Sequence, residues 1–177
     1  MRAIETIKNI WKIEDLRKRI ITTILLVLVY RAGTYVVLPG IDPQFLTQLR
    51  AQTSGGLMQL LDMFSGGAFS NASIFALGIM PYITASIVIQ LLGMALPYFQ
   101  KLQREGESGR RKLNQYTRYL TVFILLIQGP TYLVNLSVQM GGAFPTDILF
   151  TISSTIILTA GSMFIMWLGE RITDRGI

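Results

Sequence analysis

SIFALGIMPYITASIVIQLLGMAL, residues 73–96, is a run of twenty-four residues without a charged side chain. A hydrocarbon core of about 30 Å needs about 20 helical residues at a rise of 1.5 Å each. Three further runs have a similar length and apolar character, namely residues 20–38, 119–138 and 148–168. The sequence therefore predicts an all-α, polytopic membrane protein with four transmembrane helices.

The composition of the 177-residue chain agrees with this class. Hydrophobic residues make up 51% and charged residues 15%, against about 25% charged in an average soluble domain. A soluble domain of this size would have to bury more apolar side chain than its interior can hold. The absence of cysteine and histidine excludes a disulfide scaffold and the usual zinc or haem sites. We expect no cofactor and no metal ion, and an ordinary soluble globular protein is excluded.

The net charge of +6 is strongly segregated along the chain. Lysine and arginine gather in the segments 1–19, 97–118 and 169–177. Because short loops rich in these residues stay on the cytoplasmic side, all three segments are predicted to be cytoplasmic. Segments 39–56 and 139–147 are then extracytoplasmic. The same basic residues would suit RNA phosphates or anionic lipid, but topology alone explains them.

The N-terminal segment 1–19 precedes the first span. Ile4, Ile7, Trp11 and Ile13 recur there at near-helical spacing between charged residues, which predicts an amphipathic helix on the cytoplasmic surface. A disordered tail is the alternative. A signal peptide fits poorly, because the basic region is long and the apolar run exceeds the usual length of about 7 to 15 residues.

A short apolar segment, LMQLLDMF at residues 57–64, lies before the second span between two glycine pairs. It is too short to cross a bilayer. Irregular backbone at membrane depth is tolerated only inside protein or beside a water-filled cavity, and interrupted segments of this kind mark translocation paths. The residues are equally compatible with a re-entrant half-helix and with an extracytoplasmic loop that carries one surface turn.

The second span contains the sequence GIMP at residues 78–81. Proline inside a helix removes a backbone hydrogen bond, so Pro81 predicts a kink. Ile79, Ile83 and Ile87 follow at steps of four and share one helix face. Such a stripe is typical of helix packing, and the same aliphatic chemistry would suit a hydrophobic constriction that gates by dewetting. The residues alone leave both interpretations open.

Polar residues also occur inside the predicted spans. Arg31 is either a functional charge or one that snorkels to the outer surface. The Thr/Ser run at residues 151–155 is expected to bond to its own helix or to the next one. Gln128 is followed by Gly129 and Pro130, a pairing that predicts an opening near the middle of the third span.

Four stretches carry a likeness to a known family. FSGGAFSNASIFALGIMPYITASIVIQLL (64–92) resembles the plug and second helix of the SecY protein-conducting channel family, and KLQREGESGRRKLNQYTRYLTV (101–122) resembles its next segment. RAGTYVVLPGID (31–42) and MWLGERITDRGI (166–177) are similar to the end of its first helix and the turn after its fourth. The order is consistent through nearly the whole chain. The family has ten spans in two inverted halves, so the likeness implies its N-terminal portion.

The resemblance implies a function and a set of residue roles. The function is that of the central channel-forming subunit of the general secretion translocase in the bacterial inner membrane. Such a subunit passes unfolded polypeptides across the membrane, inserts membrane proteins laterally into it and is not an enzyme. The implied partners are SecE-like and SecG-like small membrane subunits, the SecA motor ATPase, the ribosome, signal sequences, nascent polypeptides and membrane lipids. The implied site residues are Ile79 and Ile83 in the pore ring, Thr84 and Gln128 at the lateral gate, and Leu57, Phe64, Ser65, Gly66, Gly67 and Ser70 in the plug, segment 57–70.

A small-solute secondary transporter is the alternative from another class, because it also uses broken helices near the midplane. Charged or substrate-chelating groups inside the spans would favour it, and apart from Arg31 the spans lack them. The sequence contains no P-loop pattern, no serine elbow and no metal-ligand spacing, so a membrane enzyme is not expected.

Overall fold

The computed structural model describes residues 13–41, 46–47, 56–139 and 147–176, with the backbone alone at 56–58 and 61. The secondary structure of this part of the chain is helical apart from one isolated antiparallel bridge between Val37 and Ser73. The helices are α2 (Glu14–Gly33), α4 (Gly56–Phe64), α5 (Met80–Ala95), α6 (Pro97–Arg104), α7 (Glu107–Gln139) and α8 (Ile148–Arg175). The predicted all-α class is confirmed.

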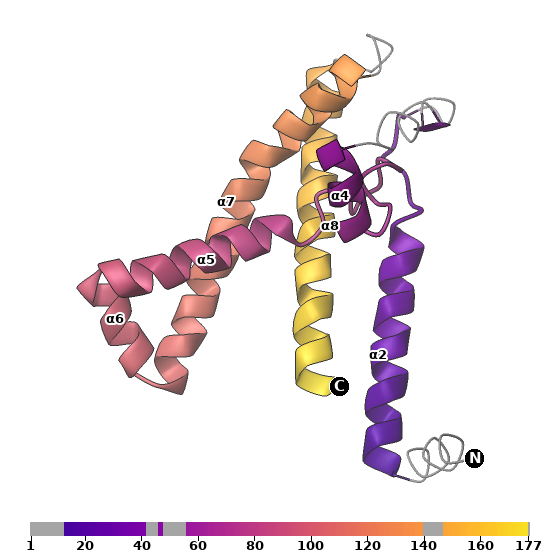
Figure 1. The fold of residues 1–177 in the computed structure, drawn as a ribbon. Helices are drawn as coiled ribbons and strands as arrows, with labels where there is room; N and C mark the ends of the chain where they lie inside the picture. The colour runs from indigo at the N-terminus through magenta and orange to yellow at the C-terminus, as the bar shows by residue number, and fades with distance from the viewer. Residues whose placement is uncertain (1–12, 42–45, 48–55, 140–146, 177) are drawn as a thin grey trace.

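The long helices are arranged around α8. Figure 1 shows α2 beside α8, while α7 meets α8 near one end and diverges from it toward the other. Helix α5 runs across α7, and α6 turns back toward the start of α7. The start of α2, the corner between α6 and α7 and the end of α8 lie on the same side of the molecule.

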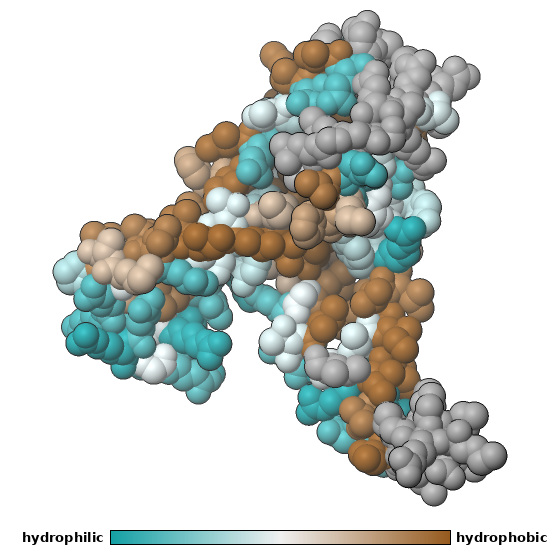
Figure 2. All heavy atoms as spheres, viewed as in Figure 1, coloured by the Kyte–Doolittle hydropathy of each residue, from teal (hydrophilic) through white to brown (hydrophobic). Residues whose placement is uncertain are grey.

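The surface is largely apolar along the helices. Figure 2 shows hydrophobic side chains over α2 and α5 and hydrophilic ones over α6 and the start of α7. None of the residues of α2 is buried, although its middle consists of aliphatic side chains. Long apolar faces of this kind are stable against lipid or against further protein, not against water.

Two of the described helices, α7 and α8, are long and apolar enough to cross a membrane. Helices α5 and α6 pass the same test together, but they are bent by 101° at the break around Leu96. Pro97 begins α6, where its missing N–H costs no hydrogen bond. Length and composition thus give two spans, or three if the bent pair is one span.

The second predicted span begins later than expected. Residues 65–79 form turns, and the helix starts only at Met80. The prediction of a kink at Pro81 is wrong, because this residue lies in the first turn of α5, where proline fits without breaking a helical hydrogen bond. Gly78 adopts φ +56°, a left-handed conformation that ends the preceding turns.

The connector expected at 97–118 is mostly helical. It consists of α6 and the first third of α7, joined by a turn in which Gly106 has φ +71°. Glu107 and Arg111 form an i,i+4 ion pair of 2.7 Å in the first turns of α7. The opposite charges at helical spacing support a helix here.

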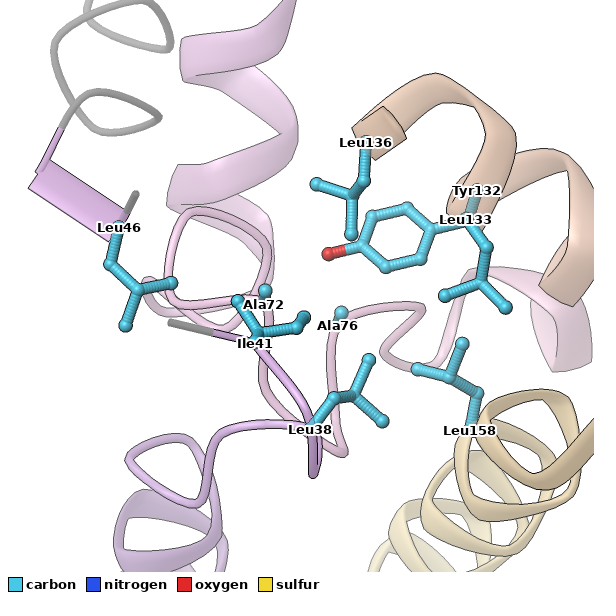
Figure 3. Close-up of a cluster of buried hydrophobic side chains, with 9 residues drawn as sticks. All are labelled: Leu38, Ile41, Leu46, Ala72, Ala76, Tyr132, Leu133, Leu136 and Leu158. Carbon is cyan, nitrogen blue, oxygen red and sulfur yellow. The ribbon is translucent and has the colours of Figure 1, made fainter. Parts of the chain in front are cut away.

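A cluster of buried side chains joins four parts of the chain (Figure 3). They come from the segment after α2, from residues 65–79, from α7 and from α8. The members are Leu38, Ile41, Leu46, Ala72, Ala76, Tyr132, Leu133, Leu136 and Leu158. The non-helical backbone of residues 65–79 is therefore enclosed by protein, as it must be if it lies at membrane depth.

Helices α7 and α8 are in close contact in their middle turns. A Cβ placed on Gly129 would lie 2.9 Å from Thr155 Cγ2, so the missing side chain lets the helices approach. Helix α7 continues through Gly129 and Pro130, and the expected opening beside Gln128 is absent from it. Thr151 and Thr155 donate to carbonyl groups of their own helix region, as expected for this run.

Three predicted segments lie largely outside the described residues. They are the amphipathic segment 1–19, of which 1–12 is not described, and the extracytoplasmic segments 39–56 and 139–147. The first predicted span, 20–38, is helical to Gly33 and begins earlier, at Glu14.

Candidate functional site

The candidate site is a cavity of about 350 Å³ between α4, α5 and α7. Its walls come from the end of α4 and the turns that follow it, from the first turns of α5 and from the middle of α7. The lining residues are Phe64, Ser65, Phe69, Ala76, Leu77, Gly78, Ile79, Met80, Ile83, Thr84 and Gln128. Six of the ten residues singled out from the sequence thus line one cavity.

The isoleucine stripe of the second span does not belong to the core of the chain. Ile79, Ile83 and Ile87 are 38%, 42% and 51% exposed. The buried positions of α5 are instead Pro81, Ala85, Ile89 and Gly93. These two sets are offset by two residues, about 200° of helix, so they lie on opposite faces. Within the described residues, the face that packs combines the small residues Ala85 and Gly93 with Pro81 and Ile89.

Ile79 lies where three cavities meet. Besides the cavity just described, it lines a polar cavity of about 700 Å³ and an apolar one of about 260 Å³. The polar cavity is bounded by α5, α7 and α8 and includes Arg118 and Glu170, which form an ion pair of 2.7 Å. An aliphatic side chain therefore separates a charged cavity from one that is mainly apolar.

Thr84 and Gln128 face the cavity from two different helices. Thr84, on α5, donates from its hydroxyl to the Met80 carbonyl oxygen at 3.0 Å, so its hydrogen-bonding group is satisfied within its own helix. Gln128, on α7, is exposed to the cavity. Because α5 and α7 contact one another directly, these two side chains mark the seam between them.

The predicted half-helix is present as α4, and Phe64 at its end is 80% exposed. Leu57 lies in α4, with a side chain outside the described part of the chain. Gly66 and Gly67 have φ +60° and +85°, a conformation that favours glycine. Ser65 lines the cavity, while Gly66, Gly67 and Ser70 lie in the following turns and do not.

Asp62 organises these turns, and the sequence reading did not single it out. Its side-chain oxygen accepts from the Ser70 N–H at 2.9 Å, and its carbonyl accepts from the Ser65 hydroxyl at 3.1 Å and from the Gly67 N–H at 2.9 Å. A lone carboxylate in an eight-residue apolar segment was the signal that could have revealed it.

Two more functional contacts escaped the sequence reading. The Tyr132 hydroxyl donates to the Phe69 carbonyl oxygen at 3.2 Å, and Asn71 Nδ2 donates to the Thr34 carbonyl oxygen at 3.2 Å. Both side chains supply donors to non-helical backbone, which requires such partners when it is enclosed. No local pattern marks these residues, because their partners are 63 and 37 positions away.

Comparison with known proteins assigns the chain to a family. The SecY family model matches residues 73–177, more than half of the chain. The protein translocase subunit SecY of Pseudomonas aeruginosa is 47% identical over 165 residues, which cover 93% of this chain and 37% of that protein. The subunit of the same name in Escherichia coli K12 is 45% identical over 166 residues, 92% of this chain and 38% of that protein.

A third relative gives the same result. The protein translocase subunit SecY of Streptomyces galbus is 45% identical over 174 residues, covering 92% of this chain and 40% of that protein. The chain thus spans less than half the length of these relatives. These matches show that the chain belongs to the SecY family.

Proposed function

We propose that this chain is the N-terminal portion of a channel that passes unfolded polypeptides across the bacterial inner membrane and releases membrane segments into lipid. The observation that carries the proposal is the cavity in which Ile79 and Ile83 meet Phe64, Thr84 and Gln128. The name shared by the relatives, protein translocase subunit, points to the same activity.

Ile79 and Ile83 would form part of the pore ring. Their side chains lie outside the buried core, at 38% and 42% exposed, and border cavities of unlike polarity. Aliphatic side chains exclude water and ions from a narrow pore by dewetting. They also seal around a chain of any sequence, because dispersion contacts require no particular partner.

Helix α4 and its turns, residues 57–70, would be the plug. The end of this short helix lines the same cavity as the isoleucines, so it would cover one mouth of the constriction. Two adjacent glycines with positive φ separate it from the anchored residues that follow. A swing about these glycines would open the mouth without disturbing α5.

The seam between α5 and α7 would be one wall of the lateral gate. Thr84 and Gln128 supply polar groups at this seam, where a signal sequence would pass from the pore into lipid. A polar wall raises the cost of leaving an apolar segment inside the pore. The gate would therefore favour release of hydrophobic segments.

In the complete subunit, α2 and the bent pair of α5 and α6 would also cross the membrane. Together with α7 and α8, this portion would then contain four spans. All three basic segments would be cytoplasmic. In support, the start of α2, the corner between α6 and α7 and the end of α8 lie on the same side of the molecule (Figure 1). We propose SecE-like and SecG-like subunits as membrane partners. The SecA motor ATPase or the ribosome would supply the driving force.

Cross-linking to a stalled secretory chain tests this function. A cysteine in place of Ile83, in a full-length channel that contains this sequence, is expected to cross-link to a cysteine in the stalled chain. A cysteine at Val134, which is 61% exposed on α7 but does not line the cavity, is the matched control and should give little product. Equal yields at the two positions would contradict a pore at this cavity.

Replacing Gln128 with leucine tests the lateral gate. The change removes a polar group from the cavity wall while keeping a similar side-chain volume, so it should change the hydrophobicity that a signal sequence needs for recognition. Export of a reporter with a weak signal sequence measures this threshold. Thr131→Leu, one turn along the same exposed side of α7 and outside the cavity, serves as the control. No difference between the two variants would assign Gln128 a purely structural role.

A further inference from the structure

The turn that ends α4 is hydrogen-bonded to the last residues of α2. The Tyr30 hydroxyl donates to the Ser65 carbonyl oxygen at 2.8 Å, and Arg31 Nη1 donates to the Gly66 carbonyl oxygen at 2.6 Å. Carbonyl groups at the end of a helix lack helical partners and carry partial negative charge. A hydroxyl and a guanidinium are therefore suitable partners for them.

Both donors are held in position by other contacts. The Tyr30 ring stacks on Phe75 with a centroid separation of 5.8 Å and an interplanar angle of 2°. The second amino group of Arg31 donates to the Tyr35 hydroxyl at 3.0 Å, and the guanidinium carbon lies 5.1 Å from the centre of that ring. The side chains thus lose little freedom when they bind the two carbonyl groups.

A glycine at the end of α2 permits this arrangement. A Cβ placed on Gly33 would lie 2.0 Å from the Phe75 ring, so the contact requires a residue without a side chain. Phe75 itself is 3% exposed and also stacks on Phe164 of α8 at 6.0 Å. The ring that positions Tyr30 is therefore fixed from two sides.

The residues that follow the glycine pair are anchored much more firmly than α4. Three hydrogen bonds tie them to the segment after α2: Leu38 N–H to Ala72 O at 3.0 Å, Ile74 N–H to Val36 O at 3.0 Å, and Asn71 Nδ2 to Thr34 O at 3.2 Å. Gly66 and Gly67, both with positive φ, lie between this anchored stretch and α4. They form a hinge.

On the other side of the hinge, the apolar side chains of α4 that the structure describes are largely exposed. Leu60, Met63 and Phe64 are 52%, 79% and 80% exposed. Among the described residues outside 56–79, Tyr30 and Arg31 are the ones whose side chains donate hydrogen bonds to residues 62–67. For the side chains described in α4, these two bonds hold the end of the helix more than burial does.

We propose that Tyr30 and Arg31 are positioning residues that latch the plug in its closed position. The inference rests on the proposed function, because it needs α4 and its turns to act as a plug. Opening would break both bonds, together with the bond from the Ser70 N–H to the Asp62 side chain, which also bridges the hinge. Arg31 thus has a defined role at the end of α2, beyond snorkelling to the surface.

The test is the resting ion conductance of the full-length channel in planar bilayers. The double variant Tyr30→Phe/Arg31→Met removes both donors, while the aromatic ring at position 30 is kept and can still stack on Phe75. The conductance is expected to rise about tenfold, a shift of about 1.4 kcal/mol in the closed-to-open equilibrium. Arg31→Lys alone keeps one charged donor and should give an intermediate rise. The thermal midpoint of the assembled channel should stay unchanged.

Two further variants distinguish a failure of the latch proposal from a failure of the plug proposal. Tyr98→Phe removes a hydroxyl that is 3.3 Å from the Tyr116 hydroxyl, far along the chain from the cavity, and should leave the conductance unchanged. Deletion of residues 57–70 should raise it. If the deletion raises the conductance and the double variant does not, the latch is wrong while the plug stands. If neither the deletion nor the double variant raises the conductance, both the plug proposal and the latch proposal are wrong.

Discussion

Serine in place of both Ile79 and Ile83 is expected to raise the resting ion conductance of the full-length channel about tenfold or more. The two side chains border the cavity and lie outside the buried core, since they are 38% and 42% exposed. Serine would let water fill the constriction and ions pass through it. Each 1.4 kcal/mol removed from the barrier to ion passage raises the conductance about tenfold. Single-channel recording in planar bilayers measures the effect.

The chain offers a closely matched control for this pair. Ile152 and Ile156 on α8 are also isoleucines spaced by four, are 54% and 60% exposed, and line none of the three cavities around Ile79. Their replacement by serine should leave the conductance near that of the unmodified channel. A rise of the same size in both double variants would indicate a general loss of packing and would remove Ile79 and Ile83 from the pore ring.

Gly161→Ala is expected to destabilise the protein by about 3 kcal/mol, at the upper end of the usual cost of overpacking. A Cβ at this position would lie 2.1 Å from the Ile74 carbonyl oxygen and 3.2 Å from Phe75 Cδ1. The first obstacle is backbone, so relief requires the turns at 65–79 to move away from α8. The measurement is the thermal midpoint of the purified full-length protein in detergent.

Gly169→Ala, on the same helix, provides the comparison. A Cβ there would meet only Ile79 Cδ1, at an ordinary 3.9 Å. Since alanine favours a helix over glycine by about 1 kcal/mol, this variant should be as stable as the unmodified protein or slightly more stable. If Gly161→Ala matches Gly169→Ala, the close approach of the 65–79 backbone to α8 is not a feature of the folded protein.

The short apolar segment and its glycines show which structural features could be predicted from the sequence. Its length indicated a half-helix or a surface turn, and α4 is indeed a nine-residue helix ending at Phe64. The start of the second span was misplaced because residues 73–79 are as apolar as the helix that follows. Hydrophobicity cannot distinguish helix from buried turns when both are enclosed by protein. The left-handed Gly78 and the position of Pro81 in the first turn decided that boundary.

The isoleucine stripe illustrates a different limit. The spacing of four residues predicts that Ile79, Ile83 and Ile87 share one helix face, and in the structure they do. The spacing could not show whether that face packs against another helix or lines a pore. The other face of α5, with Pro81, Ala85 and Gly93, packs because small residues allow close helix contact. Small residues give a weak hydropathy signal, so the periodicity of the apolar side chains did not reveal this packing face.

The sequence by itself determined the membrane class, the all-α fold and membership of the family. Apolar run length and the segregation of basic residues are sums over neighbouring residues, so they need no knowledge of contacts. Only the tertiary structure decided which residues meet: Gln128 of α7 across the cavity from Phe64, and Tyr30 and Arg31 beside the carbonyls of Ser65 and Gly66. These contacts join positions 35 to 64 residues apart, and they depend on helix packing and backbone turns that no local pattern encodes.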